Sequence, residues 1–265
     1  MAPADWEVAL WLYTGSRLVL RQFGPAFGRI CEELQAAWRD RTVRCLLLED
    51  LEEVARFNGT VSGSPAEIRI YGSNLAVLPL GGKAEQCRLA GVDAITFDQA
   101  TYTFHIRAGG ADLTIGKPAK RTEEFGDVLR NTVDGLRRRA TEALHRTFPL
   151  LDAGRLQRLV ALAPEGHSVK LTAWAGVRPD LPDALVAQGA GETLKPYFDA
   201  LRAKARADSL MAGFKFVRPD EDGAETETVE PPEAAEETRA PLFCWFFFPL
   251  EGREVTAWEA TTSRD

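Results

Sequence analysis

Apolar and polar residues alternate most clearly near the middle of the chain. Between residues 66 and 71, Ile68 and Ile70 fall on one side, and Glu67 and Arg69 fall on the other. A period of two is the pattern of a strand with one buried face. We therefore expect a half-buried strand here, with Glu67 and Arg69 on the face away from the core.

Further short runs of apolar, β-branched and aromatic residues follow, separated by turns that contain glycine. They predict strands at residues 75–80, 86–89, 92–97, 102–107 and 112–116. Gly81-Gly82 and Gly109-Gly110 are interpreted as turns and not as phosphate-binding loops, because neither has the spacing of such a loop. The pattern indicates a meander of antiparallel strands.

The segment after the last of these strands has the pattern of a long amphipathic helix. Thr122 can cap the first backbone donors, and Glu123 and Glu124 suit the positive end of a helix. Residues three and four apart then form one largely apolar face: Phe125, Val128, Leu129, Thr132, Val133 and Leu136. Such a face has to be buried, so we expect the helix to pack on the sheet.

A meander of short strands followed by a long helix resembles the pleckstrin-homology-like (PH-like) fold, including its bacterial members. The resemblance covers residues 57–148 and rests on element order and pattern. It implies an α+β unit in which an antiparallel barrel is capped by a long C-terminal helix. Lipid-binding members of the family place Lys and Arg in the first strand-to-strand loop, but here that loop, residues 61–65, has no basic residue. The resemblance then implies protein recognition at a sheet edge or beside the helix.

The start of the chain repeats part of this pattern. Residues 7–21 predict a strand, a glycine turn and a strand, and a helical pattern runs from Pro25 and continues or restarts through Phe57. The same order occurs at residues 102–136, and both helices open with Phe-Gly, which we interpret as a weak internal repeat. The sequence therefore predicts a second, partial or permuted unit. The acidic residues at 49–53 are interpreted as a solvated helix face.

The rest of the chain predicts a helical insert and three more strands. The strands are expected at residues 210–217, 242–248 and 254–261, and we expect them to pair with the N-terminal hairpin. The acidic segment 219–240 has no aromatic residue and is expected to be a disordered loop. The predicted segments are a partial unit at 1–56, the PH-like unit at 57–148, the insert at 149–208 and the C-terminal strands at 209–265.

Charge is unevenly distributed along the 265 residues. Nine acids and no base lie between residues 220 and 237, so without that segment the net charge of -7 would become +2. Such a balance gives no indication of nucleic-acid binding. The first residues lack the pattern of a secretion signal, and no apolar run is long enough to span a bilayer, so a cytoplasmic protein is expected.

Residues that carry chemistry are few. The four cysteines, Cys31, Cys45, Cys87 and Cys244, show no paired spacing and are expected to be buried structural thiols. His105 is expected on a sheet, His145 at a helix end and His167 in an exposed loop. No motif for a metal, a nucleotide or a catalytic nucleophile is present. We therefore expect no enzyme, no metal and no cofactor.

Basic side chains near the long helix form the one candidate binding surface: Lys117, Lys120, Arg121, Arg137, Arg138 and Arg139. They suit an anionic lipid surface or a phosphate, although a solvated helix face has the same composition. The favoured function is a non-enzymatic protein-interaction or scaffold module that binds a protein partner or itself, with no nucleic acid and no membrane. The alternatives are a peripheral module that binds anionic lipid, and an enzyme with an unrecognised site.

Overall fold

The structure is a computed structural model of the chain, and it describes residues 7–11, 15–21, 24–80, 82–216, 242–252 and 256–262. The chain divides into two compact units. The first consists of Met1–Cys87, Phe97–Phe104 and Thr114–Phe125, and the second of Arg88–Thr96, His105–Leu113 and Gly126–Asp265. The predicted acidic loop at 219–240 lies outside the described residues.

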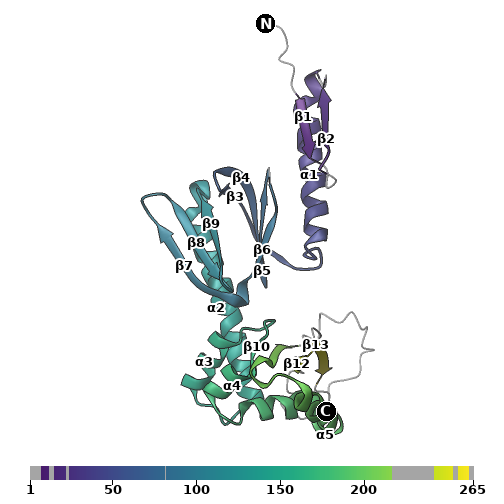
Figure 1. Cartoon of the computed structure of the whole chain (residues 1–265). Coiled ribbons are helices and arrows are strands. Elements are labelled where there is room, and N and C mark those ends of the chain that lie inside the picture. Colours follow the sequence, from purple (N-terminus) through teal and green to yellow (C-terminus); the bar gives the residue numbers. More distant parts are fainter. Residues whose placement is uncertain are drawn as a thin grey trace, which may run out of the picture. The chain divides into compact units, whose positions relative to one another are not determined.

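Seven strands form the largest sheet: β3 (Glu53–Val61), β4 (Ser64–Tyr71), β5 (Asn74–Pro79), β6 (Glu85–Arg88), β7 (Val92–Asp98), β8 (Thr103–Ala108) and β9 (Ala111–Gly116). Their order is β6-β5-β4-β3-β9-β8-β7, so the first strand lies beside the last (Figure 1). The predicted α+β class is confirmed. The described strands form open antiparallel sheets, however, and no closed barrel is found among them.

In two hairpin turns of this sheet, both central residues have a positive φ. Gly109 and Gly110 both have positive φ, 55° and 84°, and connect β8 to β9. Ser62 and Gly63 also have positive φ, 50° and 80°, and connect β3 to β4. Two central residues with positive φ match the twist of the flanking strands. The Gly109-Gly110 turn was predicted from the sequence.

One face of the sheet packs on the start of helix α2 (Thr122–Thr147) through aromatic side chains. Phe125 lies 5.2 Å from Phe57 of β3 and 4.9 Å from Phe104 of β8, measured between ring centroids, and both pairs are edge-on. All three side chains are almost fully buried. Phe57 lies opposite Ile68, so Ile68 belongs to the same face.

The other face of β4 and β5 packs on helix α1 (Phe27–Cys45) and the residues that follow it. Val43 and Leu48 form a buried cluster with Tyr71, Ala76 and Leu78. The expectation that this side of β4 faces solvent was therefore wrong, since both faces of the strand are covered.

Helix α1 ends at Cys45, and the predicted helix through Phe57 was wrong. Leu47 has a φ of 55°, and the Leu48 amide donates to the Val43 carbonyl while the Leu47 amide donates to the Arg44 carbonyl. This pair of bonds is a Schellman motif, which ends a helix. Glycine usually occupies the position of Leu47, so no residue in the sequence marked the stop.

The residues after the end of α1 form strand β3, and close contacts with its neighbours explain why residue 59 is a glycine. A Cβ at Gly59 would lie 2.8 Å from the Ile68 Cδ1 atom and 2.9 Å from the Gly116 carbonyl oxygen. Glycine therefore permits the close approach of β3 to its neighbours.

The second unit has its own core, built from helices and a four-stranded sheet. Its helices are the later part of α2, α3 (Ala153–Leu162), α4 (Leu171–Val177) and α5 (Leu181–Lys204), and its strands are β10 (Val169–Lys170), β11 (Met211–Phe216), β12 (Leu242–Pro249) and β13 (Thr256–Thr262). Phe198 of α5 packs edge-on against Phe246 and Phe248 of β12, with centroids 5.0 Å away in each case.

The expected pairing of the C-terminal strands with the N-terminal hairpin was wrong for the described strands. The hairpin strands β1 (Glu7–Trp11) and β2 (Arg17–Arg21) form a sheet of their own. Strand β12 lies between β11 and β13, so both of its edges are already hydrogen-bonded.

Within the described residues, none of the helices combines the length and the apolar composition that a membrane span requires.

Replacing Phe125 with alanine should lower the free energy of unfolding by about 3–5 kcal/mol, because the substitution removes the ring between β3 and β8 and leaves a cavity. Urea denaturation followed by circular dichroism measures the change. Leu150→Ala, at a side chain that is 82% exposed, is the control and should change stability by less than about 0.5 kcal/mol. Equal effects of the two substitutions would contradict the packing of Phe125 between these strands.

Candidate functional site

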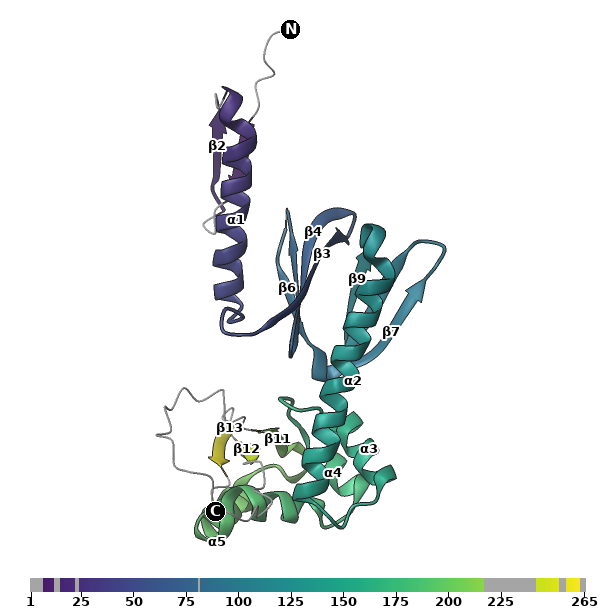
Figure 2. The ribbon, with the colours of Figure 1, turned by 180° about the vertical axis from the view of Figure 1, so that it is seen from behind.

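The N-terminal hairpin and helix α1 lie side by side but bury little. Both views show β1 and β2 running along α1 (Figures 1 and 2). Among the described side chains between residues 7 and 45, Val43 is the one buried residue. Val8, Leu10 and Leu34 are only half-buried. An element with so few buried side chains gains little stability from its own core.

A groove of about 300 Å³ lies between the hairpin, α1 and the end of β5. We call it the hairpin groove, and it is lined by Val8, Ala9, Leu10, Cys31, Leu34, Gln35, Trp38, Leu80 and Gly82. Most of these side chains are apolar. Trp38 and Leu80 are 36% and 47% exposed, so two large apolar side chains of the same groove are open to solvent. Exposed apolar residues that adjoin one another often mark a binding surface.

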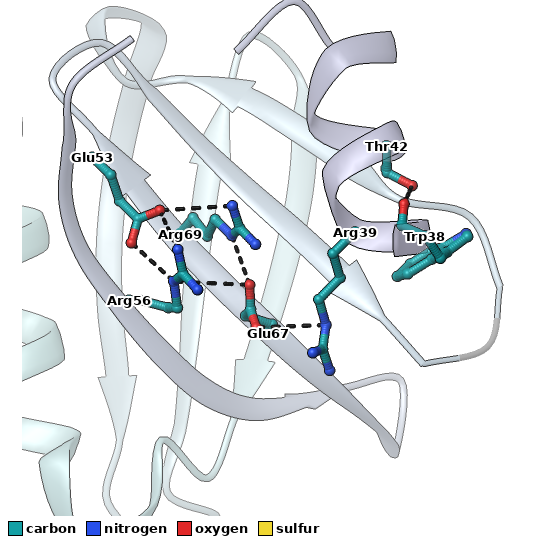
Figure 3. Close-up of polar contacts among 7 residues, drawn as sticks. All are labelled: Trp38, Arg39, Thr42, Glu53, Arg56, Glu67 and Arg69. Atoms are coloured by element: carbon teal, nitrogen blue, oxygen red, sulfur yellow. Dashed lines mark hydrogen bonds and ion pairs between the residues drawn. The ribbon is translucent and has the colours of Figure 1, made fainter. Parts of the chain in front are cut away.

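A network of charged side chains lies beneath α1 and joins it to the sheet. Arg39 of α1 points toward Glu67 on β4, and the Arg39 Nε atom lies 3.5 Å from a Glu67 carboxylate oxygen (Figure 3). Arg69 donates from Nε to Glu67 at 2.6 Å. Glu67 and Arg69 are only 7% and 8% exposed, so this is a buried pair. Trp38, the residue before Arg39, points away from the network toward the groove side of the helix.

Arg56 and Glu53 extend the same network toward solvent. Arg56 forms a two-pronged pair with Glu53, with both distances 2.9 Å, and the Arg69 Nη1 atom lies 3.7 Å from Glu53 (Figure 3). Arg56 and Arg69 are directly opposite on neighbouring strands, where like charges repel. Two carboxylates among three guanidiniums offset that repulsion.

The surroundings of these arginines keep them charged. Burial alone would lower the pKa of Arg69, but the hydrogen bond to Glu67 and the charge of that carboxylate outweigh it and raise the pKa above its ordinary value. The hydrogen bond to Glu53 raises the pKa of Arg56. The network is therefore ionic, and its role here is to hold α1, and with it the hairpin groove, on the sheet.

The basic residues predicted as a binding surface divide between the two units. Lys117, Lys120 and Arg121 belong to the first unit, and the three arginines Arg137–Arg139 belong to the second. Lys117, Lys120, Arg138 and Arg139 are exposed. The other two arginines also make structural contacts.

Arg121 and Arg137 hold backbone groups in place. Arg121 donates to the Arg56 carbonyl at 2.9 Å and to Glu124 at 2.6 Å, and it lies 4.4 Å from the Phe57 ring centroid. Arg137 donates to the Val92 carbonyl at 2.6 Å. Sequence reasoning recognised the charge of these residues but not these contacts.

One of the three histidines, His167, is less exposed than expected. His105 and His145 are exposed, whereas His167 is half-buried, with its Nδ1 atom 3.2 Å from the Glu165 carbonyl oxygen. A Cβ at Gly91 would lie 2.7 Å from the His167 ring, so this ring packs closely on the chain there. In the part of the chain that the structure describes, no group of three or more His, Cys, Asp or Glu side chains is placed to hold a metal ion.

Comparison with known proteins gives no relative: no protein-family model matches the chain, and no curated protein matches it.

In the part of the chain that the structure describes, none of the four cysteines forms a disulfide, and the expectation that they are buried was wrong for Cys45, which is exposed. Burial raises the pKa of Cys87 from 9.0 to about 11 and the pKa of Cys244 to about 12. Cys31 is half-buried in the hairpin groove. Its position makes it a chemical reporter for that surface.

At pH 8, iodoacetamide should modify Cys45 first and Cys31 next, while Cys87 and Cys244 react far more slowly. A pKa of about 11 in place of 9.0 leaves about 100-fold fewer thiolates at Cys87. Peptide mapping by mass spectrometry over time measures the four rates, and urea-unfolded protein is the control in which the rates should converge. Alkylation of Cys87 in the folded protein as fast as that of Cys45 would be inconsistent with this order.

Replacing Glu67 with glutamine should destabilise the protein by about 3 kcal/mol, because it leaves the buried Arg69 guanidinium with only the more distant Glu53 carboxylate as a counter-charge. Thermal and urea denaturation measure the loss. The matched control is Glu33→Gln, which removes an exposed pair with Arg29 and should cost less than about 0.5 kcal/mol. A neutral Glu67→Gln would show that the network does not hold α1 in place.

Proposed function

We propose that this chain is a non-enzymatic protein-interaction or scaffold module of the cytoplasm, built on PH-like units, which binds a protein segment in the hairpin groove. The observation that carries the proposal is the apolar groove beside a hairpin and helix that bury almost nothing themselves. Apolar surface left half-exposed by one chain is stabilised when a partner covers it.

The PH-like part of the proposal is supported by the order of the elements. Strands β3–β6 and strands β7–β9 each follow one another as neighbours, the first strand, β3, lies beside the last, β9, and a long helix follows. Phe125, in the first turn of that helix, packs on the sheet.

The hairpin also supports one particular mode of recognition. In the described residues β1 and β2 pair only with each other, so each has an outer edge whose backbone groups are not used in a sheet. An extended segment can add a strand at such an edge and place an apolar side chain in the neighbouring groove. We therefore propose that the partner presents an extended segment with a large apolar residue. A second copy of this chain is the other source of such a segment.

The membrane-surface alternative has weaker support. It depends on six basic side chains, of which Arg121 and Arg137 already hold backbone carbonyl groups. These six residues also belong to two different units.

Replacing Trp38 with alanine should weaken partner binding at least tenfold, because a large exposed aromatic side chain that lines an apolar groove has the character of a binding hot spot. In a chain that carries Cys45→Ser, a photoreactive benzophenone attached to Cys31 would crosslink the bound segment, and mass spectrometry would identify it. Binding of that segment as a synthetic peptide would then be measured by calorimetry for both forms of the protein.

The matched control is Tyr197→Ala, an aromatic residue that is 55% exposed on α5 in the second unit. Both variants should keep the unfolding midpoint of the wild type to within a few degrees. If a peptide from the chain itself is crosslinked, light scattering should show a dimer or larger assembly that Trp38→Ala dissociates. The proposal fails if no segment is crosslinked, or if Trp38→Ala binds the identified peptide as tightly as Tyr197→Ala does.

A further inference from the structure

A second cleft, larger than the hairpin groove, lies entirely within the second unit. Its volume is about 450 Å³, which is within the range of small-molecule sites. We call it the arginine cleft, and it is lined by Ala90–Asp93, by Arg137, Arg138 and Thr141 of α2, by Gln157, Val160 and Ala161 of α3, and by Pro164. It shares no residue with the hairpin groove, so a ligand site here would be independent of the proposed function.

The lining combines apolar side chains with polar groups that converge from different elements. Val160, Ala161 and Pro164 supply apolar surface, whereas Thr141 and Gln157 supply hydrogen-bonding groups from two different helices. A small number of polar groups in a partly apolar concavity is the usual composition of a ligand site.

Arg137 is positioned before any ligand arrives. Its guanidinium donates to the Val92 carbonyl at 2.6 Å and lies 4.0 Å from Asp134. A guanidinium has five N–H donors, and the bond to Val92 uses one of them. Because the side chain is already held in place, contact with a ligand costs less conformational entropy there.

The charges of the cleft favour an anion. Arg137 and Arg138 are adjacent in sequence and both line it, while Asp93 is the one carboxylate of the lining. In the part of the chain that the structure describes, no carboxylate forms an ion pair with Arg138. The lining therefore has a net positive charge. A guanidinium can bind a phosphate or a carboxylate through two parallel N–H···O hydrogen bonds.

A smaller hollow of about 190 Å³ adjoins the cleft and shares Val92, Asp93 and Arg137 with it. Arg137 and Asp93 therefore line two neighbouring hollows. Asp93 can accept hydrogen bonds from the hydroxyl groups of a ligand. This arrangement suits a ligand that has an anionic group and a hydroxyl-bearing body.

We propose that the arginine cleft binds a small hydroxylated molecule that carries a phosphate or carboxylate group. Arg137 and Arg138 hold the anionic group, Asp93 and Gln157 contact the hydroxyl groups, and Val160 and Ala161 pack against the carbon skeleton.

The test uses two probes of similar size, glycerol 3-phosphate and glycerate, with the full chain labelled with nitrogen-15. At low salt, one or both should cause saturable shifts in the NMR signals of residues 90–93, residues 137–141 and the Gln157 side-chain amide. Arg138→Gln should weaken that binding about tenfold, the usual effect of removing one charge-assisted contact. This variant keeps the structural bond of Arg137 to Val92.

The matched control is Arg155→Gln on α3, whose exposed side chain pairs with Asp152 and does not line the cleft. It should bind the probe as the wild type does. Saturation by glycerol 3-phosphate alone assigns a phosphorylated ligand, saturation by glycerate alone assigns a carboxylate ligand, and saturation by both shows that the cleft accepts either anion. The proposal is overturned if neither probe saturates at tens of millimolar, or if Arg138→Gln and Arg155→Gln weaken binding equally.

Discussion

The buried carboxylate of Glu67 is the constraint on which the first unit depends. A charge so far from solvent is costly unless it is paired, and Glu67 is paired on two sides, by Arg69 on its own strand and by Arg39 on helix α1. The contact with Arg39 joins a helix to a strand that comes much later in the chain. It therefore fixes where α1 lies on the sheet, and the apolar cluster of Val43, Leu48 and Leu78 packs around it.

The two faces of β4 make different kinds of contact: one face packs through apolar side chains, and the other carries the ion pairs that position α1. On one face, Ile68 lies opposite Phe57, which packs edge-on against Phe125 of α2. On the other face, the Glu67 carboxylate accepts a hydrogen bond from Arg69 and forms an ion pair with Arg39 of α1. The hairpin groove lies between the hairpin, α1 and the end of β5, so its shape depends on where this ion pair holds α1, although none of its lining residues belongs to the network.

The sequence predicted six of the seven strands of the large sheet, β4 to β9, and helix α2, because alternation at period two and apolar recurrence at period 3.6 are local signals. It failed where the cause was not local. Leu47, just after α1, has a backbone conformation that glycine usually adopts. Because no glycine marks the end of the helix in the sequence, the start of β3 was predicted to be helical. Glu67 and Arg69 alternate like solvent-facing residues, and only the helix packed above them buries the pair. Their opposite charges, two residues apart on one face, were the signal available, but that spacing is equally common on exposed strands.

Hydrogen exchange measured by mass spectrometry tests whether the hairpin is stable without a partner. In our account the sheet is well packed, whereas the hairpin and α1 are stabilised only when a partner binds. Amide exchange reports the free energy of local opening, which is low where few side chains are buried. Amides of residues 7–21 in the free protein should exchange at least about 100-fold faster than those of residues 66–78. Protection of the hairpin equal to that of the sheet would contradict this picture, because the hairpin would then be stable without a partner.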